Sequence, residues 1–231
     1  MIKGIQEVFF MRHEAKHYIT YEDQLILRNR LRAVTKEDPH ARDGRYFIRS
    51  LYFDNIDDKA LMEKLNGVNV REKFRIRFYN MDTSFIQLEK KSKNGSLGTK
   101  VSAILTPEQV ESIIHGDLAW MSDLEEPLVR ELYCKMITQG LRPKTIVDYT
   151  REPFIYVPGN VRITMDYNIR TGLHSTDFLN RDCVTIPVQG NPNILEIKWD
   201  EYLPDVIRDI VQLKGCLTGS YSKYAACRAF G

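Results

Sequence analysis

Hydrophobic and polar residues alternate with a period of two through much of the chain, which is the pattern of strands with one buried face. The segments with this alternation are residues 8–19, 45–54, 70–79, 84–91, 99–105, 145–155, 161–167, 183–188 and 193–199. Helical spacing occupies residues 21–34, 57–65, 128–139 and 203–213, and a further helix is expected to open at Thr106-Pro107-Glu108. The order predicts an α+β fold with antiparallel pairing, because few connections are long enough for a parallel crossover.

Length and composition narrow the class of protein. The chain has 231 residues, of which 43% are hydrophobic and 28% are charged. That length can bury a core, and without a repeat or linker it predicts one domain over residues 1–231. No apolar run approaches the ~20 residues of a membrane span, and the N-terminus does not read as a signal peptide. The four cysteines are widely spaced, which argues against a disulfide scaffold or a cysteine zinc site and predicts cysteines in the core of a cytoplasmic protein.

The charges are unevenly placed along the strands. In residues 70–79 one face carries Arg71, Lys73, Arg75 and Arg77, and the other face is mainly apolar. The same division recurs in other strand segments, and these faces together with Lys223 hold 13 basic residues against four acidic ones. The basic members are Arg12, Lys16, Arg71, Lys73, Arg75, Arg77, Lys91, Lys93, Lys100, Arg151, Arg162, Lys198 and Lys223, and the acidic members are Glu14, Glu89, Asp166 and Glu196.

This imbalance contrasts with the whole chain, which has 33 Lys and Arg residues against 31 Asp and Glu residues. The net charge of +2 argues against a general nucleic-acid binder. A sheet face that is merely solvated should mix the two signs as the rest of the chain does. The charged faces therefore indicate an external anion, although an antiparallel sheet with one solvated side remains the alternative for any single strand.

A barrel of about eight antiparallel strands would bring these faces together. With the charges inside and the apolar faces outside under amphipathic helices, close like-charge pairs would repel by several kcal/mol at an effective dielectric of ~20. A polyanion filling such a tunnel would relieve that repulsion. Arginine forks suit phosphate oxygens, and a few carboxylates among them suit Mg²⁺ or Mn²⁺ bridging phosphates.

The same residues carry a resemblance to a known family. In chain order the motifs are Arg12-His-Glu14-Ala-Lys16, Ser50-Leu-Tyr52-Phe-Asp54, Arg71-Glu-Lys73-Phe-Arg75-Ile-Arg77-Phe-Tyr79, Leu88-Glu89-Lys-Lys91, Lys100, Tyr149-Thr-Arg151, Arg162-Ile-Thr-Met-Asp166, Leu195-Glu196-Ile-Lys198 and Ser222-Lys223-Tyr224. Over nearly its whole length the chain resembles the catalytic domain of VTC-type polyphosphate polymerases, within the triphosphate tunnel metalloenzyme (CYTH-like) superfamily.

The resemblance implies an antiparallel tunnel barrel with flanking helices, which binds a linear phosphate chain and a divalent metal, Mn²⁺ or Mg²⁺. It implies transfer of the ATP γ-phosphate onto inorganic polyphosphate. By position, the residues that match the family's phosphate-binding basic residues are Lys16, Arg75, Arg77, Lys91, Lys100, Arg151, Arg162 and Lys223. The further substrate-binding candidates are Arg71, Lys73, Lys93, Tyr149, Lys198 and Ser222.

Glu196 matches the family's metal-binding glutamate. Glu14, Glu89 and Asp166 are further candidate ligands that could instead only pair with basic neighbours. The wider superfamily begins with Glu-x-Glu-x-Lys, whereas this chain has Arg12-x-Glu14-x-Lys16. This departure favours the VTC branch and one metal over two. Regulatory and membrane segments of eukaryotic members are not found in this sequence, so neither their regulation nor any protein partner is implied.

Two other motifs point to different chemistry. Residues 13–17 match the His-Glu-x-x-His pattern of zinc proteases, which requires a helix; in a strand the two histidines stand ~13 Å apart and cannot share a zinc ion. The Gly-rich stretch at residues 95–100 lacks the spacing of a phosphate-binding loop and predicts a hairpin turn. The rival functions that stay open are an inorganic triphosphatase of the same fold and a non-catalytic polyphosphate-binding subunit.

Overall fold

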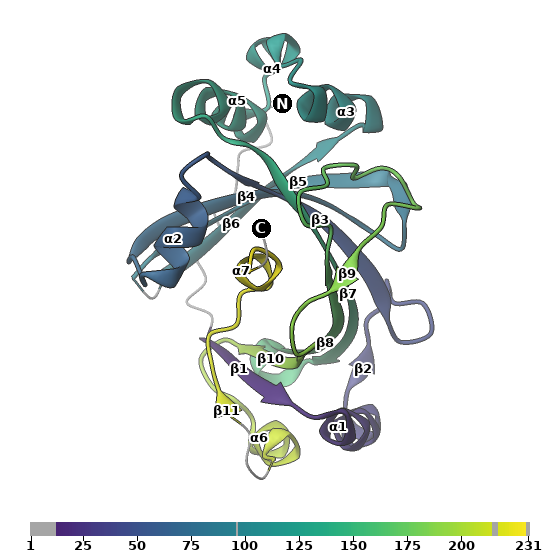
Figure 1. Ribbon diagram of the computed structural model, residues 1–231. Coiled ribbons are helices and arrows are strands. Elements are labelled where there is room, and N and C mark those ends of the chain that lie inside the picture. The colour runs from purple at the N-terminus through teal and green to yellow at the C-terminus, as the bar shows by residue number, and fades with distance from the viewer. Residues whose placement is uncertain (1–12, 96, 214–216, 230–231) are drawn as a thin grey trace.

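A strongly curved antiparallel sheet forms the centre of the computed structural model, which describes residues 13–95, 97–213 and 217–229 (Figure 1). The strands are β1 (His13–Ile19), β2 (Lys36–Glu37), β3 (Tyr46–Asp54), β4 (Val70–Tyr79), β5 (Asp82–Asn94), β6 (Leu97–Leu105), β7 (Arg142–Tyr156), β8 (Val161–Thr171), β9 (Ile186–Pro187), β10 (Asn193–Trp199) and β11 (Leu217–Thr218). They are ordered β11-β1-β10-β8-β7-β3-β4-β5-β6, with β2 on β7 and β9 on β8.

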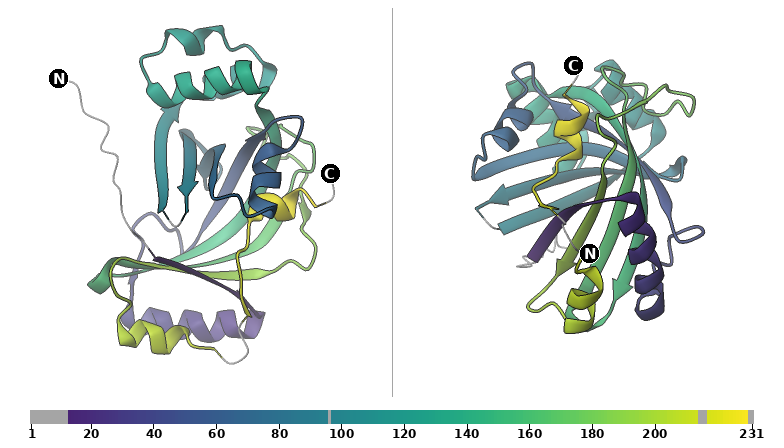
Figure 2. Two further views of the ribbon diagram at one scale, coloured as in Figure 1. Left: turned by 90° about the vertical axis from the view of Figure 1, so that its left-hand side faces the viewer. Right: turned by 60° about the horizontal axis from the view of Figure 1, so that its bottom comes forward.

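The helices lie around this sheet (Figure 2). They are α1 (Tyr21–Val34), α2 (Lys59–Leu65), α3 (Pro107–His115), α4 (Ala119–Asp123), α5 (Pro127–Gln139), α6 (Asp205–Val211) and α7 (Lys223–Cys227), with a 3₁₀ turn at Pro158–Asn160. The antiparallel strand-rich architecture with flanking helices is therefore confirmed.

The sheet curls around its concave face without closing through hydrogen bonds. Within the described ranges β6 does not pair with β1 or β11, so the two ends of the sheet remain unjoined. The short helix α7 lies against the concave side of the sheet, where it contacts α2, β7 and β8 (Figure 1). One curled sheet and a C-terminal helix thus form the region in which the tunnel was expected.

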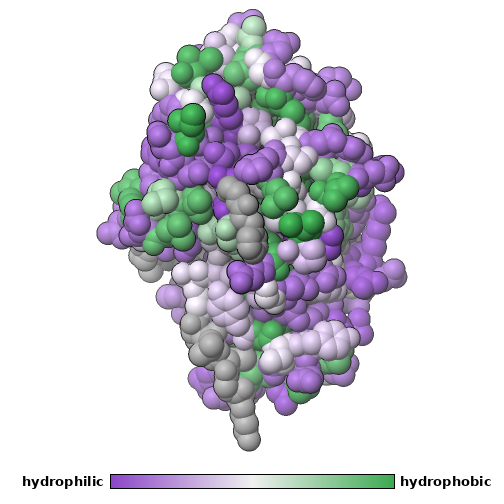
Figure 3. Space-filling model, in the orientation of Figure 1, coloured by the Kyte–Doolittle hydropathy of each residue, from purple (hydrophilic) through white to green (hydrophobic). Residues whose placement is uncertain are grey.

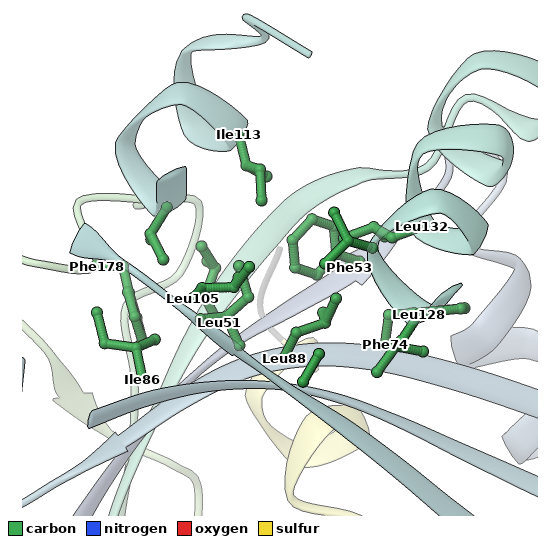
Figure 4. Packing of buried hydrophobic residues seen from close by; sticks show 14 of the residues in the cluster. Leu51, Phe53, Phe74, Ile86, Leu88, Leu105, Ile113, Leu128, Leu132 and Phe178 are labelled. Atoms are coloured by element: carbon green, nitrogen blue, oxygen red, sulfur yellow. The ribbon is translucent and has the colours of Figure 1, made fainter. Parts of the chain in front are cut away.

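The convex face is covered by amphipathic helices, as the alternation predicted. One apolar core joins β4, β5 and β6 to α3, α4 and α5, with residues such as Phe74, Leu88 and Leu132 fully buried (Figure 4). A second core packs α1 and α6 against β8 and β10 through Leu27 and Ile207. Strands β4, β5, β6 and β10 thus pack their apolar faces against helices and turn their charged faces inward. A third apolar cluster, which includes Ile48, Tyr52 and Tyr224, joins β3 to α7.

Local signals fix the ends of these helices. Thr106 caps α3 through a reciprocal capping box with Gln109, and Thr20 caps α1 with Asp23 in the same way. Helices α3 and α5 stop at Gly116 and Gly140, both with positive φ. These boundaries follow from short-range sequence chemistry, and the expected helix over 21–34 is confirmed without change.

Several expectations differ from the structure. The segment expected over 183–188 pairs only at Ile186–Pro187, and its other residues are irregular. Helix α4, with five residues, is too short for a helical period and was not predicted. Cys227 is buried as expected, but Cys134 is exposed on α5, so its assignment to the core is wrong. Residues 8–12, including Arg12, and Cys216 lie outside the described residues.

The outer surface of the face seen in Figure 3 is mostly hydrophilic, with hydrophobic side chains gathered over α2, where Met62 and Leu65 are exposed. Among the described residues, no helix combines the length and the hydrophobicity that crossing a membrane requires.

Candidate active site

One half of the concave face carries a large excess of positive charge. It is formed by β4, β5 and β6, whose register places Lys73 opposite Lys91 and Lys91 opposite Lys100. We call this surface the basic wall. Its members are Arg71, Lys73, Arg75, Arg77, Glu89, Lys91, Lys93 and Lys100.

Glu89 is the one acidic residue of the basic wall and is fully buried. Its carboxylate accepts from Arg75 Nε at 2.7 Å and pairs with Lys100 Nζ at 2.6 Å, and Arg77 lies 3.8 Å away. Burial alone would raise the pKa of Glu89, but the charges of Arg75, Arg77 and Lys100 outweigh it and hold that pKa far below its usual range. Glu89 is therefore ionised, and its charge is already shared among three cations.

Lys73 and Lys91 have no acidic partner among the described residues. Burial, with the charges of Arg75 and Lys16, lowers the pKa of Lys73 to about 7. The charge of Arg75, then burial and the charge of Lys198, lowers the pKa of Lys91 well below its ordinary value. Lys16 and Lys198, whose charges contribute to these shifts, belong to β1 and β10 in the other half of the sheet.

The opposite half of the concave face is rich in paired charges. It is formed by β1, β10, β8, β7 and α7, and we call it the paired wall. Its members are Glu14, Lys16, Tyr149, Arg151, Asp166, Glu196, Lys198 and Lys223.

Glu14 and Glu196 are linked by two shared lysines. Lys16 lies opposite Glu196 in the ladder, with its Nζ 3.2 Å from Oε1, and it also pairs with Glu14. Lys198 Nζ lies 3.1 Å from Glu196 and 3.7 Å from Glu14. Burial alone would raise the pKa of Glu196, but Lys198, Lys16 and Arg151 lower it well below its usual value. Both carboxylates thus converge on one small region.

A second cluster in the paired wall centres on Asp166. Arg151 donates two hydrogen bonds to its carboxylate at 2.6 and 2.7 Å, and Lys223 Nζ lies 2.5 Å from it. Burial would raise the pKa of Asp166, but Arg151 and Lys223 bring it down to about 2. The ring of Tyr149 lies beneath both cations, 5.5 Å from Arg151 and 4.7 Å from Lys223. Its hydroxyl accepts from Arg77 at 2.8 Å, which joins the two walls.

The donor set of the paired wall fits a divalent cation held jointly with phosphate. No group of three His, Cys, Asp or Glu residues within the described part of the chain could hold a metal ion alone. However, Glu14 and Glu196 already place their oxygens around shared positive charges. Mg²⁺ in phosphate chemistry is commonly bound by one or two carboxylates, substrate oxygens and water. Glu89 has its own partners in the basic wall and is not brought into this set.

Other candidate residues lie at the edges of the concave face. Arg162 binds Asp38 at 3.2 Å and the Tyr46 hydroxyl at 2.9 Å. Arg71 donates to the backbone carbonyl of Val68. The hydroxyl of Ser222 accepts from the Ala225 N–H as the N-cap of α7, so its expected contact with substrate competes with a structural role. Lys93 is exposed at the end of β5.

The structure adds residues that the candidate set lacked. Tyr52 accepts from Arg75 at 2.8 Å, and its ring stacks on Tyr224 of α7. The hydroxyls of Ser50 and Thr164 are buried on the concave face, and no described residue hydrogen-bonds them. Thr164 lies opposite Glu196 in the ladder. Ser50 and Tyr52 lie in one of the motifs that carry the family resemblance, and Thr164 shares the alternating face of Arg162 and Asp166, but none of the three was among the candidate site residues.

The rival motifs do not form sites. His13 and His17 lie in a strand, and His13 stacks on Trp199 at 5.5 Å, so the zinc-protease pattern is not on a helix. Strands β5 and β6 pair up to Asn94 and Leu97, as expected for a hairpin whose residue 96 is outside the described residues.

A hollow of about 820 Å³ lies on the other face of the sheet, beside α1. The buried carboxylate of Glu152 that lines it accepts from Arg28, Gln24 and Tyr167. The buried carboxylate of this hollow is therefore partnered, unlike Lys73 and Lys91 on the concave face.

Comparisons with known proteins agree with this geometry. Residues 11–230 match the VTC domain, and no curated protein matches the chain. The solved structure of a putative adenylyl cyclase, HpAC1 from Hippeastrum, described as having a dominant triphosphatase activity, is 14% identical with a TM-score of 0.56 over 93% of each chain. A putative adenylate cyclase from Bacillus halodurans is 10% identical with a TM-score of 0.48, over 84% of this chain and 82% of that chain. The Hippeastrum structure has the same fold, and because the VTC match spans nearly all of the sequence, the chain belongs to the VTC domain family.

Proposed function

We propose that the protein is a metal-dependent polyphosphate polymerase, which transfers the γ-phosphate of ATP onto a growing inorganic polyphosphate chain. The observation that supports this is the unbalanced basic wall, where Lys73 and Lys91 lie close to other cations with no acidic partner among the described residues. Such an arrangement costs free energy in the unliganded protein, and a linear polyanion would offset that cost.

The basic wall would hold the donor and acceptor phosphates. Phosphoryl transfer depends mostly on positioning and on stabilising charge, so a preformed array of cations supplies most of what the reaction needs. Arg77 and Arg75 are fixed by Tyr149, Tyr52 and Glu89, which orients their guanidinium groups before substrate arrives. Lys91 and Lys100 extend this array along β5 and β6.

Glu196 and Glu14 would hold Mn²⁺ or Mg²⁺ on the paired wall, and the metal would neutralise charge that develops on the transferred phosphoryl group. Lys16 and Lys198 now occupy the positions around both carboxylates. They would turn toward phosphate oxygens when a metal takes their place.

No general base is required among the side chains. The terminal oxygen of a polyphosphate is already largely ionised near neutral pH, so it attacks without losing a proton to the protein. Arg151 and Lys223, which are held on Asp166, are placed to stabilise charge near the paired wall. If water attacked instead, the same arrangement would act as an inorganic triphosphatase.

Incubation with ATP and Mn²⁺ separates the candidate functions. The polymerase yields long phosphate chains, a triphosphatase yields free phosphate, and a non-catalytic polyphosphate-binding subunit yields neither. The variant Glu196→Gln in the same assay shows whether the products come from this site. Free phosphate without chains from the wild-type protein would overturn the polymerase in favour of the triphosphatase.

A further inference from the structure

Toward one end of the basic wall the concave face becomes apolar. Ile104 of β6 is 56% exposed and Phe85 of β5 is 48% exposed, although both belong to strands whose other face is in the core. Their neighbours Ile86 and Leu105 are buried on the helix side of the sheet (Figure 4). Strand alternation places Ile104 on the concave side with Lys100. Phe85 lies where the register of β5 against β4 shifts, and its exposure beside the buried Ile86 places it on the same side.

These two side chains adjoin the proposed phosphate site. The ladder places Arg77 opposite Gln87, and Gln87 opposite Ile104, so a single cross-strand row runs from a guanidinium through an amide to an apolar surface. Neighbouring strands are about 4.8 Å apart, so Arg77 and Ile104 are separated by roughly 10 Å. Along β6, Lys100 and Ile104 are four residues and about 13 Å apart.

The row and the neighbouring Phe85 offer three kinds of contact. Arg77 has a buried Nε that no described residue satisfies. The amide of Gln87 makes no hydrogen bond with any side chain or backbone group in the described ranges, so it keeps donors and an acceptor for a ligand. Phe85 offers an exposed aromatic ring, on which any nucleobase can stack.

An inorganic phosphate chain has no group that uses the apolar end of this row. A nucleotide does, because it joins a polyanionic tail to a flat, largely apolar base with hydrogen-bonding edges. A triphosphate spread over the lysines near Lys100 would leave its sugar and base directed toward Ile104, since the wall is continuous between them.

We propose that Phe85, Gln87 and Ile104 form a nucleobase site, which binds the base of a nucleoside triphosphate whose phosphates lie on the basic wall. The inference rests on the proposed function, because it assumes that the basic wall binds phosphates. Such a site would let the basic wall bind ATP more tightly than an inorganic triphosphate.

The test compares the binding of ATP and of tripolyphosphate, both without metal, by calorimetry. Phe85→Ala should weaken ATP binding between about fivefold and 100-fold, the range for one base stacked on an aromatic side chain, and leave tripolyphosphate binding within twofold. Phe85→Trp should keep ATP binding at the wild-type level or strengthen it. Ile137→Ala is the matched control, because Ile137 is 62% exposed on α5 and should change neither ligand.

Gln87→Ala provides a second, independent variant and should weaken ATP more than tripolyphosphate. Equal effects of Phe85→Ala on both ligands, or no effect on either, would overturn the nucleobase site. Failure of the wild-type protein to bind tripolyphosphate would instead overturn the proposed function, so the two failures are distinguishable.

Discussion

The two walls of the concave face differ in how their cations are balanced: the basic wall holds seven cations and one carboxylate, and the paired wall holds four cations and three carboxylates. On the paired wall, Lys16 and Lys198 each contact both Glu14 and Glu196, and Arg151 and Lys223 each contact Asp166. On the basic wall, a single carboxylate, that of Glu89, pairs with Arg75, Arg77 and Lys100. One wall is neutralised largely by its own carboxylates, and the other keeps an excess of positive charge.

From this difference we expect the paired wall to bind the metal ion and the basic wall to bind phosphate. Carboxylates with pKa values below their usual range, such as Glu196, favour the ionised form that a divalent metal ion prefers. Lysines with depressed pKa values, such as Lys73 and Lys91, are unfavourably placed until phosphate arrives. The comparison predicts that substitutions on the paired wall change metal dependence, whereas substitutions on the basic wall change phosphate affinity and the stability of the unliganded protein.

The largest expected effect comes from Glu196→Gln on the paired wall. Loss of even an outer partner of a metal site costs about 10- to 100-fold, so loss of a ligand should lower turnover on the order of 100-fold and shift Mn²⁺ dependence to higher concentration. Binding of tripolyphosphate without metal should persist or strengthen, because a negative charge has gone.

The matched control is Glu152→Gln, which removes a buried carboxylate paired with Arg28 on the outer face of the sheet. It should lower stability and leave the Mn²⁺ titration unchanged. An unaltered metal dependence in Glu196→Gln would make Glu196 an ion-pair partner only.

A polyanion should stabilise the fold, because it relieves repulsion that exists only in the folded basic wall. Tripolyphosphate at about 100 times its Kd should add roughly 2.7 kcal/mol, which for a chain of this length corresponds to a rise in Tm of about 5–10 °C. Thermal unfolding measures the shift, which should shrink at high salt. A rise no larger than that given by chloride at equal ionic strength would argue against an anion site.

Lys91→Met should separate affinity from stability on the basic wall. Removal of a cation crowded by Arg75 and Lys198 should raise the free energy of unfolding of the unliganded protein by about 1 kcal/mol. Tripolyphosphate affinity should fall about tenfold, since a hydrogen bond to a charged group contributes about 1.5–3 kcal/mol. Chemical denaturation and calorimetry give the two quantities.

The neighbouring Lys90→Met is the control for this variant, because Lys90 points to the other face and pairs with Glu72 and Glu131. It should lower stability slightly and leave affinity unchanged. A loss of stability in Lys91→Met as large as in Lys90→Met would contradict the crowding of Lys91.

The smallest expected effect is a pH dependence carried by Lys73. Its pKa is about 7 in the folded protein and 10.5 ordinarily, so between these values the unfolded chain binds a proton that the folded chain has lost. The stability of the unliganded protein should therefore rise with pH through this window, and Lys73→Met should flatten that rise.

Phosphate near Lys73 should restore its charge. Wild-type protein should then take up more protons than Lys73→Met when tripolyphosphate binds at pH 8.5, as measured by calorimetry in buffers of different ionisation enthalpy. Equal proton uptake by both proteins would show that Lys73 is already charged without ligand.

Much of this architecture was predictable from short-range pattern. The expected strand over 70–79 and the expected helix over 21–34 match β4 and α1, because a period of two or of 3.6 and the Thr20 cap are properties of local sequence. The segregation of Arg75 and Arg77 from Phe74 and Ile76 likewise follows from alternation alone. The sequence thus determined which side chains share a face, and that one such face carries excess positive charge.

Only the tertiary structure decided which of these charges meet. Alternation places both Glu89 and Glu196 on charged faces. Strand register then pairs Glu89 with Arg75 and Lys100. It pairs Glu196 with Lys16 and Lys198. Register and curl depend on long-range packing, which no local period encodes. Helix α7 brings Lys223 onto Asp166 from 57 positions away because it packs on β7 and β8, so the balance of each wall is a property of the folded chain.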